Sequence, residues 1–377
     1  HHYIQNQCFT YPPNLIKNYY LSLKTKPFVL LAGISGTGKT KLVELFAEAI
    51  GCTSDNNRFE LISVRPDWND SSDLLGYQDL QNNFQPGPMI DVIKRANEDP
   101  DQIYFACLDE MNLARVEYYF SDFLSKMETR KKTGDRIKTD KLMTANDFAG
   151  NKDDNQDFKY ADIIIPDNLY IVGTVNMDET THPFSKKVLD RANTIEFSEV
   201  DLGNIPVDNN KESEVELPDN ISNEFLKPEY VVLKDCLDEK ENQTIIEDVV
   251  AELKKINAIL KTANLHVGYR VRDEICFYMI YALRNNIMDF KTALDFQIMQ
   301  KILPRIQGSS KVIKEVLIKL LTRASGKDYT TVNGDIGKKA INYVEKYEED
   351  MNYPKTAAKL AFMIKRMEAD GFTAYWL

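Results

Sequence analysis

One short stretch of this sequence limits the fold more than any other. It reads Gly-Ile-Ser-Gly-Thr-Gly-Lys-Thr over residues 33–40 and matches the phosphate-loop pattern G-x-x-x-x-G-K-[ST]. It lies between an apolar segment, 27–32, and an amphipathic segment, 41–50, so it joins a predicted buried strand to a predicted helix. There, backbone N–H groups converge at a helix N-terminus and bind phosphate. The chain is therefore predicted to bind a nucleoside triphosphate.

Two side chains of this loop supply chemistry that a phosphate site requires. Lys39 places a point charge beside the β- and γ-phosphates, and the Thr40 hydroxyl is a ligand for Mg²⁺. A glycine-rich turn with an incidental lysine is the alternative, and the strand-then-helix setting argues against it. The predicted nucleotide-binding residues of the loop are Gly33, Ile34, Ser35, Gly36, Thr37, Gly38, Lys39, Thr40 and Lys41.

Two acids follow another apolar segment, 103–108. Asp109 and Glu110 come directly after it, and in an open α/β sheet the carboxyl end of such a strand faces the ligand crevice. We predict that Asp109 holds the magnesium ion with its water shell and that Glu110 orients or deprotonates the attacking water. A helix cap at Asp109 is the alternative interpretation.

A fourth apolar segment, 169–174, leads to Asn176. The Asn176 amide could position the same water from the neighbouring strand end, or it could be an ordinary turn residue. The sequence leaves both interpretations open. With Lys39 and Glu110, Asn176 belongs to the predicted catalytic group.

The pattern of apolar segments predicts an α/β fold. From residue 27 to about 197, short apolar runs alternate with amphipathic stretches, which is typical of a parallel sheet covered by helices on both faces. From residue 246 onward the apolar spacing is helical throughout. We therefore expect a five-stranded parallel sheet flanked by helices and then a smaller helical domain. The predicted strands are 27–32, 59–64, 103–108, 169–174 and 194–197.

Changes in composition suggest the domain boundaries. Residues 1–26 are a lead-in, in which His1 and His2 are interpreted as a tag remnant, and polar residues over 199–245 predict an irregular linker. The predicted organisation is a lead-in over 1–26, an α/β domain over 27–198 with an insertion at 129–166, a linker over 199–245 and a helical lid domain over 246–377.

Charge and cysteine content exclude several classes of protein. The net charge of −11 argues against non-specific binding of nucleic acid by the whole surface, and the basic stretch 130–138 is interpreted as a solvated hairpin rather than a DNA contact. The five scattered cysteines predict neither a disulfide framework nor a zinc site, and fit a reducing cytoplasm. No apolar run reaches the roughly 18 residues that span a bilayer, so no membrane contact is expected.

The order of these motifs resembles that of the AAA+ ATPases. A phosphate loop, Asp109-Glu110, Asn176 and Arg191 come in sequence and precede a helical domain. The stretches 108–115 (LDEMNLAR), 172–178 (VGTVNMD) and 371–376 (GFTAYW) are similar to the McrB family, the motor subunits of McrBC modification-dependent restriction systems. The resemblance covers about residues 14–377.

The resemblance implies a ring, usually a hexamer, in which each site is completed by an arginine of the next subunit. Arg191 is the candidate for this arginine, with a helix C-terminal cation as its alternative role, and Arg115 is a second candidate. The resemblance also implies a second-domain arginine that senses the γ-phosphate, and Arg270 or Arg272 fits that position.

Two departures from the family limit what it implies. McrB proteins prefer GTP, and an Asn-Thr-Ala-Asp element is associated with that preference, whereas this chain reads Asn176-Met177-Asp178, one residue shorter. Asp178 is kept as a nucleotide-binding candidate, and the base is left as GTP or ATP. McrB subunits also carry a DNA-reading domain ahead of the motor, whereas only some 30 residues precede the loop here. DNA is therefore expected to be bound by a separate domain or a partner.

Three functions compete. The first is a ring motor that hydrolyses GTP or ATP and works with an McrC-like endonuclease subunit, which stimulates hydrolysis and cuts DNA, since this chain has no recognisable nuclease residues. The second is a MoxR-like ATPase that remodels a protein. The third is a nucleotide-gated scaffold with little turnover, and the presence of Glu110 and Asn176 counts against it.

Overall fold

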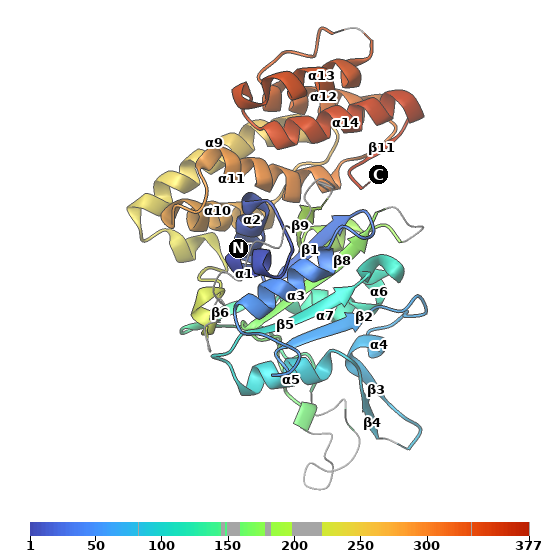
Figure 1. Ribbon diagram of the computed structural model, residues 1–377, viewed down its shortest axis with the longest axis vertical. Helices are drawn as coiled ribbons and strands as arrows, with labels where there is room; N and C mark the ends of the chain where they lie inside the picture. Colours follow the sequence, from blue (N-terminus) through green and yellow to red (C-terminus); the bar gives the residue numbers. More distant parts are fainter. Residues whose placement is uncertain are drawn as a thin grey trace. The chain divides into compact units, whose positions relative to one another are not determined.

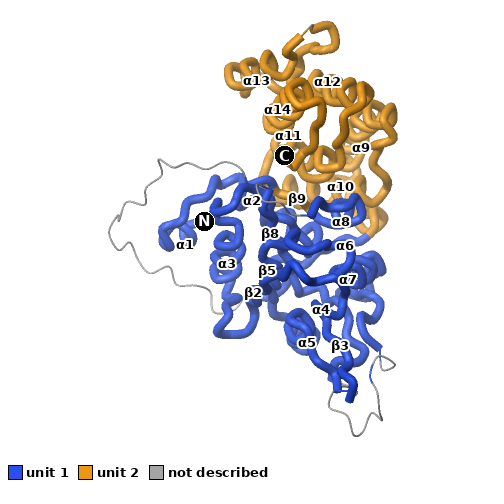
Figure 2. The backbone as a smooth tube through the Cα atoms, turned by 90° about the vertical axis from the view of Figure 1, so that its right-hand side faces the viewer, with its two compact units in different colours: residues 1–192, 196–231 blue, residues 193–195, 232–377 orange. Residues whose placement is uncertain are grey.

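The computed structural model divides into two compact units (Figure 2). The first comprises residues 1–192 and 196–231, and the second comprises residues 193–195 and 232–377. The structure describes residues 1–81, 83–144, 148, 159–177, 182–197, 221–332 and 334–376.

A five-stranded parallel sheet is present, as predicted; its last strand in sequence includes residues 193–195, which are grouped with the second unit. Its strand order is β2-β5-β8-β1-β9, so β1 lies beside β8 and away from β2, the next strand in sequence (Figure 1). β1 and β8 are buried along their whole length, because helices cover both faces of the sheet. The strands are β1 (Phe28–Gly33), β2 (Phe59–Ser63), β5 (Tyr104–Asp109), β8 (Leu169–Asn176) and β9 (Asn193–Glu196).

Helices pack on the two faces of this sheet. Figure 2 shows α1 and α3 on one side of the strands and α6 and α7 on the other. Two hairpins extend the first unit, β3–β4 (Gly76–Gln78, Phe84–Pro86) and β6–β7 (Lys131–Thr133, Arg136–Lys138). The helices are α1 (His2–Asn6), α2 (Pro13–Thr25), α3 (Lys39–Ala49), α4 (Ser72–Leu75), α5 (Ile90–Glu98), α6 (Val116–Tyr119), α7 (Ser121–Met127) and α8 (Lys186–Leu189).

The segment predicted as a lead-in, 1–26, is part of this unit. It folds into α1 and α2, and α2 buries Tyr19, Leu21 and Leu23 completely. Burying apolar side chains of this size stabilises a fold by about 1.5–3 kcal/mol each. The boundary predicted at residue 27 is therefore wrong, because α2 supplies core.

The predicted linker also differs from what the structure shows. Residues 221–231, which we call the strap, belong to the first unit, and residues 240–245 already lie in helix α9 (Lys240–Lys261) of the second. The predicted boundary at 246 is therefore too late. The strap is irregular, but it belongs to the first unit because hydrogen bonds hold it to distant parts of that unit. Residues 198–220, and the predicted insertion over 145–147 and 149–158, lie outside the described residues.

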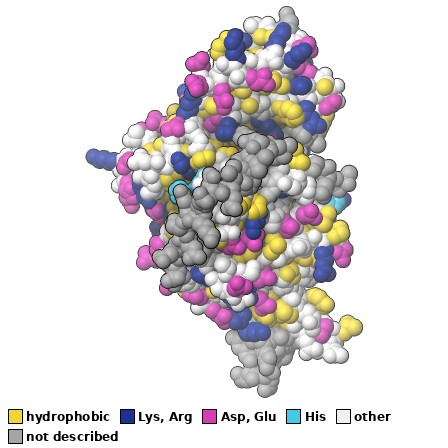
Figure 3. Space-filling view, in the orientation of Figure 1, with side chains coloured by type: hydrophobic (Ala, Val, Ile, Leu, Met, Phe, Trp, Pro, Cys, Tyr) yellow, Lys and Arg dark blue, Asp and Glu magenta, His cyan; other side chains and the backbone are white. Residues whose placement is uncertain are grey.

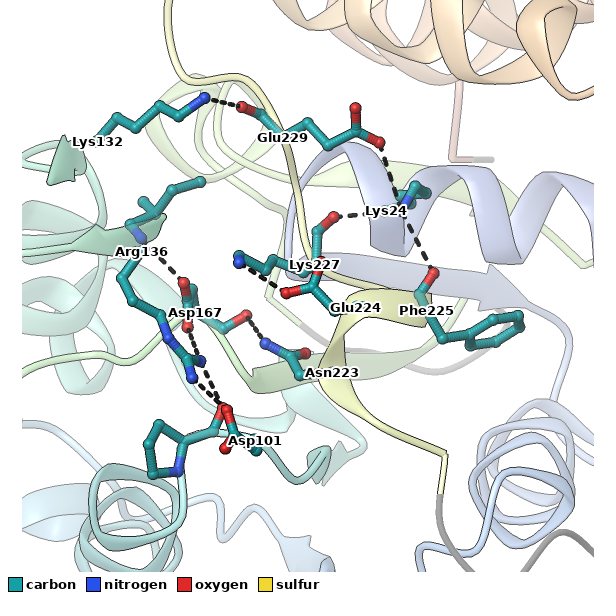
Figure 4. Close-up of polar contacts among 12 residues, drawn as sticks. Lys24, Asp101, Lys132, Arg136, Asp167, Asn223, Glu224, Phe225, Lys227 and Glu229 are labelled. Carbon is teal, nitrogen blue, oxygen red and sulfur yellow. Dashed lines mark hydrogen bonds and ion pairs between the residues drawn. The ribbon is translucent and has the colours of Figure 1, made fainter. Parts of the chain in front are cut away.

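Polar contacts fasten the strap on several sides (Figure 4). Lys24 of α2 donates to the carbonyl oxygens of Phe225 (3.4 Å) and Lys227 (3.3 Å), and Lys132 of the β6–β7 hairpin donates to that of Glu229 (3.1 Å). Figure 4 also shows Arg136 of the hairpin directed at Asp101 and Asp167, with nitrogen–oxygen distances of 2.5 and 3.5 Å. The basic stretch thus forms the predicted hairpin, and these cations bind the chain's own carboxylates and carbonyls.

Asn223 is the buried anchor of the strap. Its Oδ1 accepts a hydrogen bond from the Tyr170 hydroxyl at 2.8 Å, and its side chain is 2% exposed. Burial raises the pKa of Tyr170 well above its ordinary value, so this hydroxyl remains a donor. Tyr170 is the second residue of β8, and the strap is therefore tied to the central sheet.

We expect Asn223→Ala to lower the free energy of unfolding by about 1–3 kcal/mol, because it leaves a buried hydroxyl without its acceptor. Guanidinium denaturation measures the change. The double variant with Tyr170→Phe removes the orphaned hydroxyl and should recover part of the loss. An unchanged unfolding midpoint for Asn223→Ala would show that the strap does not stabilise the unit.

The second unit is helical, as the spacing of apolar residues predicts. A two-residue antiparallel pair, β10 (Gln307–Gly308) with β11 (Thr373–Ala374), holds the C-terminal segment. No helix among the described residues is long and apolar enough to cross a membrane. On the face of the molecule that Figure 3 draws, acidic and basic side chains are mixed. The helices are α9 (Lys240–Lys261), α10 (Tyr269–Arg284), α11 (Phe290–Gln297), α12 (Lys311–Ser325), α13 (Ile336–Tyr347) and α14 (Pro354–Asp370).

Candidate nucleotide site

The phosphate loop joins the end of β1 to the start of α3. Gly38 is the residue that caps α3, with φ +85° and ψ 20°, a conformation that L side chains rarely adopt. Gly33 is needed for a different reason, since a Cβ there would lie 2.1 Å from the carbonyl oxygen of Phe197. Only glycine satisfies both positions, which explains their place in the motif.

Lys39 folds back over the loop. Its Nζ donates to the carbonyl oxygens of Gly33 (3.1 Å) and Ile34 (2.7 Å), and the residue is 5% exposed. The ammonium is therefore held inside the loop by backbone groups. This arrangement places a positive charge at the phosphate loop.

A hydroxyl–carboxylate–hydroxyl chain links three elements beside the loop. The Thr40 hydroxyl on α3 donates to Asp109 Oδ1 at 2.6 Å, and the Thr174 hydroxyl on β8 donates to the same oxygen at 2.7 Å. Strand pairing explains the approach, because β5 and β8 are parallel neighbours and end at the same edge of the sheet. Asp109 is thus in contact with Thr40, its predicted co-ligand.

Glu110 and Asn176 also meet at this edge. Asn176 Nδ2 donates to Glu110 Oε1 at 3.0 Å. The Glu110 backbone adopts a left-handed conformation, φ 53° and ψ 48°, and its N–H donates to the Thr174 hydroxyl at 2.9 Å. Left-handed backbone at a non-glycine residue costs of order 1–3 kcal/mol and concentrates at functional sites. The strain turns the Glu110 carboxylate towards Asn176.

The sequence did not predict which residues hold Glu110 and Asn176 in place. Thr174 bridges Asp109 and the Glu110 backbone, and Asn112, in a 3₁₀ turn over Met111–Leu113, donates from Nδ2 to the Asn176 carbonyl oxygen at 3.0 Å. Period-two alternation along β8 places Thr174 on the same face as Asn176, and that was the available signal. No local pattern in the sequence indicated a role for Asn112.

The residues present fit a magnesium ion. Thr40 and Asp109 offer hard oxygen ligands within hydrogen-bond distance of each other, which suits Mg²⁺, an ion that keeps several waters and binds through one or two carboxylates plus substrate phosphates. No cluster of three or more His, Cys, Asp or Glu side chains for a metal occurs in the part of the chain that the structure describes. A site that relies on phosphate oxygens does not require such a cluster.

The two candidate interface arginines differ in their surroundings. Arg191, after α8, forms an ion pair with Glu128 (2.5 Å) and donates to the Lys187 carbonyl oxygen (2.6 Å). Arg115 is exposed, and its guanidinium lies 5.7 Å from the centroid of the Tyr118 ring. Arg191 therefore has a charged partner within its own unit, whereas Arg115 is exposed and donates to the Tyr118 hydroxyl at 3.4 Å.

The remaining predicted residues are on α10, on α3 and outside the described residues. Arg270 and Arg272 occupy the first turn of α10 in the second unit, where Arg272 pairs with Asp273 at 2.5 Å. Lys41 pairs with Glu44 at 2.8 Å on α3. Asp178 lies outside the described residues.

Two family models match different parts of the chain. Residues 28–192 match the AAA domain of the dynein-related subfamily, and residues 214–372 match a domain of unknown function, DUF8727. The first range contains the phosphate loop, both acids and Asn176.

One curated relative and one solved structure are similar to this chain. The Type IV methyl-directed restriction enzyme EcoKMcrB subunit of Escherichia coli strain K12 is 24% identical over 193 residues, which is 51% of this chain and 38% of that protein's length. A candidate ATPase structure from Cytophaga hutchinsonii superposes with a TM-score of 0.42 and 17% identity, over 77% of this chain and 80% of that one. From its family match and its sequence similarity, this chain contains an AAA+ ATPase domain that resembles McrB.

Proposed function

We propose that this chain is the magnesium-dependent nucleoside triphosphatase motor of a DNA restriction system of the McrBC type, and that it hydrolyses GTP or ATP to the diphosphate and phosphate. The hydrogen bond of 3.0 Å between Asn176 Nδ2 and Glu110 Oε1 carries the proposal of turnover. A protein that only binds nucleotide has no use for a strained carboxylate with an amide beside it. The similarity to the EcoKMcrB subunit supports the restriction system.

The residues of the site divide the reaction between them. Backbone N–H groups of residues 34–40 and the Lys39 ammonium bind the phosphates, and Thr40 and Asp109 would hold Mg²⁺. When bound, the ion would neutralise negative charge on the phosphate oxygens. Glu110 accepts the proton of the attacking water or orients it, and Asn176 fixes the direction of the Glu110 carboxylate. Lys39, Glu110 and Asn176 are therefore the proposed catalytic residues within the subunit.

We further propose a homo-oligomeric ring, of six subunits by analogy, in which Arg191 of each subunit stabilises charge on the phosphoryl group bound by its neighbour. The Arg191–Glu128 ion pair must then open or rearrange on assembly. The proposed partner is an McrC-like endonuclease subunit, with DNA bound by a separate domain or partner. All five cysteines are unpaired thiols, in keeping with a reducing cytoplasm as the proposed location.

Steady-state hydrolysis of GTP and of ATP, each with and without MgCl₂ and with and without a candidate partner subunit, tests the proposal. We expect magnesium-dependent release of phosphate from at least one nucleotide, and stimulation by the nuclease subunit. If no turnover is detectable with either nucleotide, the motor function is excluded. If the protein instead co-purifies with a metal-binding-domain protein and remodels it, the restriction role is excluded and a MoxR-like role replaces it.

A further inference from the structure

The N-terminal segment reaches the phosphate loop through Tyr11. The Tyr11 hydroxyl donates to the Gly38 carbonyl oxygen at 3.0 Å, although the two residues are 27 positions apart. Tyr11 is 5% exposed, and its ring meets that of Phe197 edge to face, with centroids 5.7 Å apart. Burial raises the pKa of Tyr11 to about 12, so the hydroxyl keeps its proton at neutral pH and remains a donor.

The accepting carbonyl lies at the junction of loop and helix. Gly38 O also accepts from the Leu42 N–H at 2.9 Å, which is the first hydrogen bond of α3. A Cβ added to Gly38 would lie 3.0 Å from the Tyr11 hydroxyl oxygen, so the tyrosine is seated directly against this peptide. One carbonyl therefore connects the phosphate loop, the first turn of α3 and the N-terminal segment.

Neighbouring residues keep Tyr11 in place. The Phe9 ring stacks on it with centroids 6.5 Å apart, and Lys41 Nζ lies 5.8 Å from the centroid of Phe9. Pro12 and Pro13 follow at once, and their fixed φ angles restrict the backbone where α2 begins. The hydroxyl is therefore held in position rather than carried on a freely rotating segment.

We propose that Tyr11 is a positioning residue for nucleotide binding, which holds the Gly38 peptide in the conformation that directs the loop N–H groups at the phosphates. The inference rests on the proposed nucleotide site. Without this bond Gly38, which lacks a Cβ, populates further backbone conformations. The apparent dissociation constant rises as the binding-competent fraction falls. A bound nucleotide restores the loop, so turnover at saturation does not depend on Tyr11.

The test compares two tyrosine variants of the full chain. Tyr11→Phe removes the hydroxyl and keeps the ring against Phe197. Tyr3→Phe is the matched control, because the Tyr3 hydroxyl also binds α3, at Glu48 Oε2 (3.0 Å) near the end of the helix far from the loop. We expect Tyr11→Phe to raise Kd and KM for the hydrolysed nucleotide roughly 3- to 10-fold, with kcat within about twofold. Tyr3→Phe should change neither.

Hydrogen exchange of residues 34–42 without nucleotide gives a second readout. Tyr11→Phe should exchange faster there, and saturating nucleotide should abolish the difference, which a purely structural role would not produce. Equal KM values and equal exchange in Tyr11→Phe and wild type would overturn the inference and leave the proposed function intact. A wild-type protein that binds neither GTP nor ATP would overturn both.

Discussion

Glu110→Gln is expected to lower kcat roughly 10²- to 10⁴-fold, the range that a general base contributes. Nucleotide affinity should stay within about threefold of wild type, because glutamine preserves the volume of the side chain and leaves the phosphate loop untouched. Phosphate release at saturating nucleotide measures kcat, and titration with a fluorescent nucleotide measures Kd. The physical reason is that Glu110, which has a left-handed backbone and accepts a hydrogen bond from Asn176, is the proposed general base.

Glu60→Gln is the matched control for this experiment. Glu60 lies on β2 and pairs with Arg95 at 3.1 Å, so the variant also replaces an ion-paired carboxylate on a strand of the same sheet. Its kcat should equal that of wild type. If Glu110→Gln retained wild-type turnover, Glu110 would be a structural turn residue and the base would have to be sought elsewhere.

Arg191→Ala should lower kcat by about 10³- to 10⁵-fold if its guanidinium completes the site of a neighbour. Mixing Arg191→Ala with Glu110→Gln should restore part of the activity. In a mixed ring some interfaces join an intact Glu110 to an intact Arg191, although neither variant has both. Phosphate release from the mixture, compared with each variant alone, measures the recovery.

Two controls separate this role from a structural one. Glu128→Gln breaks the ion pair with Arg191 but leaves the guanidinium, so it should retain hydrolysis, whereas a structural role would make both variants fail alike. Arg115→Ala in the same assay decides between the two candidate arginines. No recovery in the mixture would exclude Arg191 as a residue that acts across an interface.

The strands and the phosphate loop could be read from the sequence because their physical causes are local. Strands buried on both faces are continuous apolar runs, and each predicted strand lies within one or two residues of its observed bounds. The loop is set by the φ angle of Gly38 and by the close approach at Gly33, so its residue types are nearly obligatory. Asp109 and Asn176 were found for the same reason, since they follow recognisable strands.

Contacts across long stretches of sequence could not be predicted. Lys24 binds the strap about 200 residues away, and Tyr11 binds Gly38 from a segment interpreted as a lead-in. Neither Tyr11 nor Lys24 belongs to a local sequence motif that would predict these contacts. Thr174 stood in a quoted motif, yet its bond to Asp109 depends on β8 lying beside β5, which is a property of strand order.

The phosphate loop, the acids and the α/β class are therefore what this sequence determined by itself, because glycine conformation, apolar periodicity and strand ends act over a few residues. The tertiary structure alone decided that the Thr40 and Thr174 hydroxyls donate to the same oxygen of Asp109 and that Asn176 donates to the Glu110 carboxylate. It alone also decided that the Tyr11 hydroxyl donates to the Gly38 carbonyl oxygen. Each of these depends on which segments become neighbours when the core is buried, and that choice is made by the whole chain.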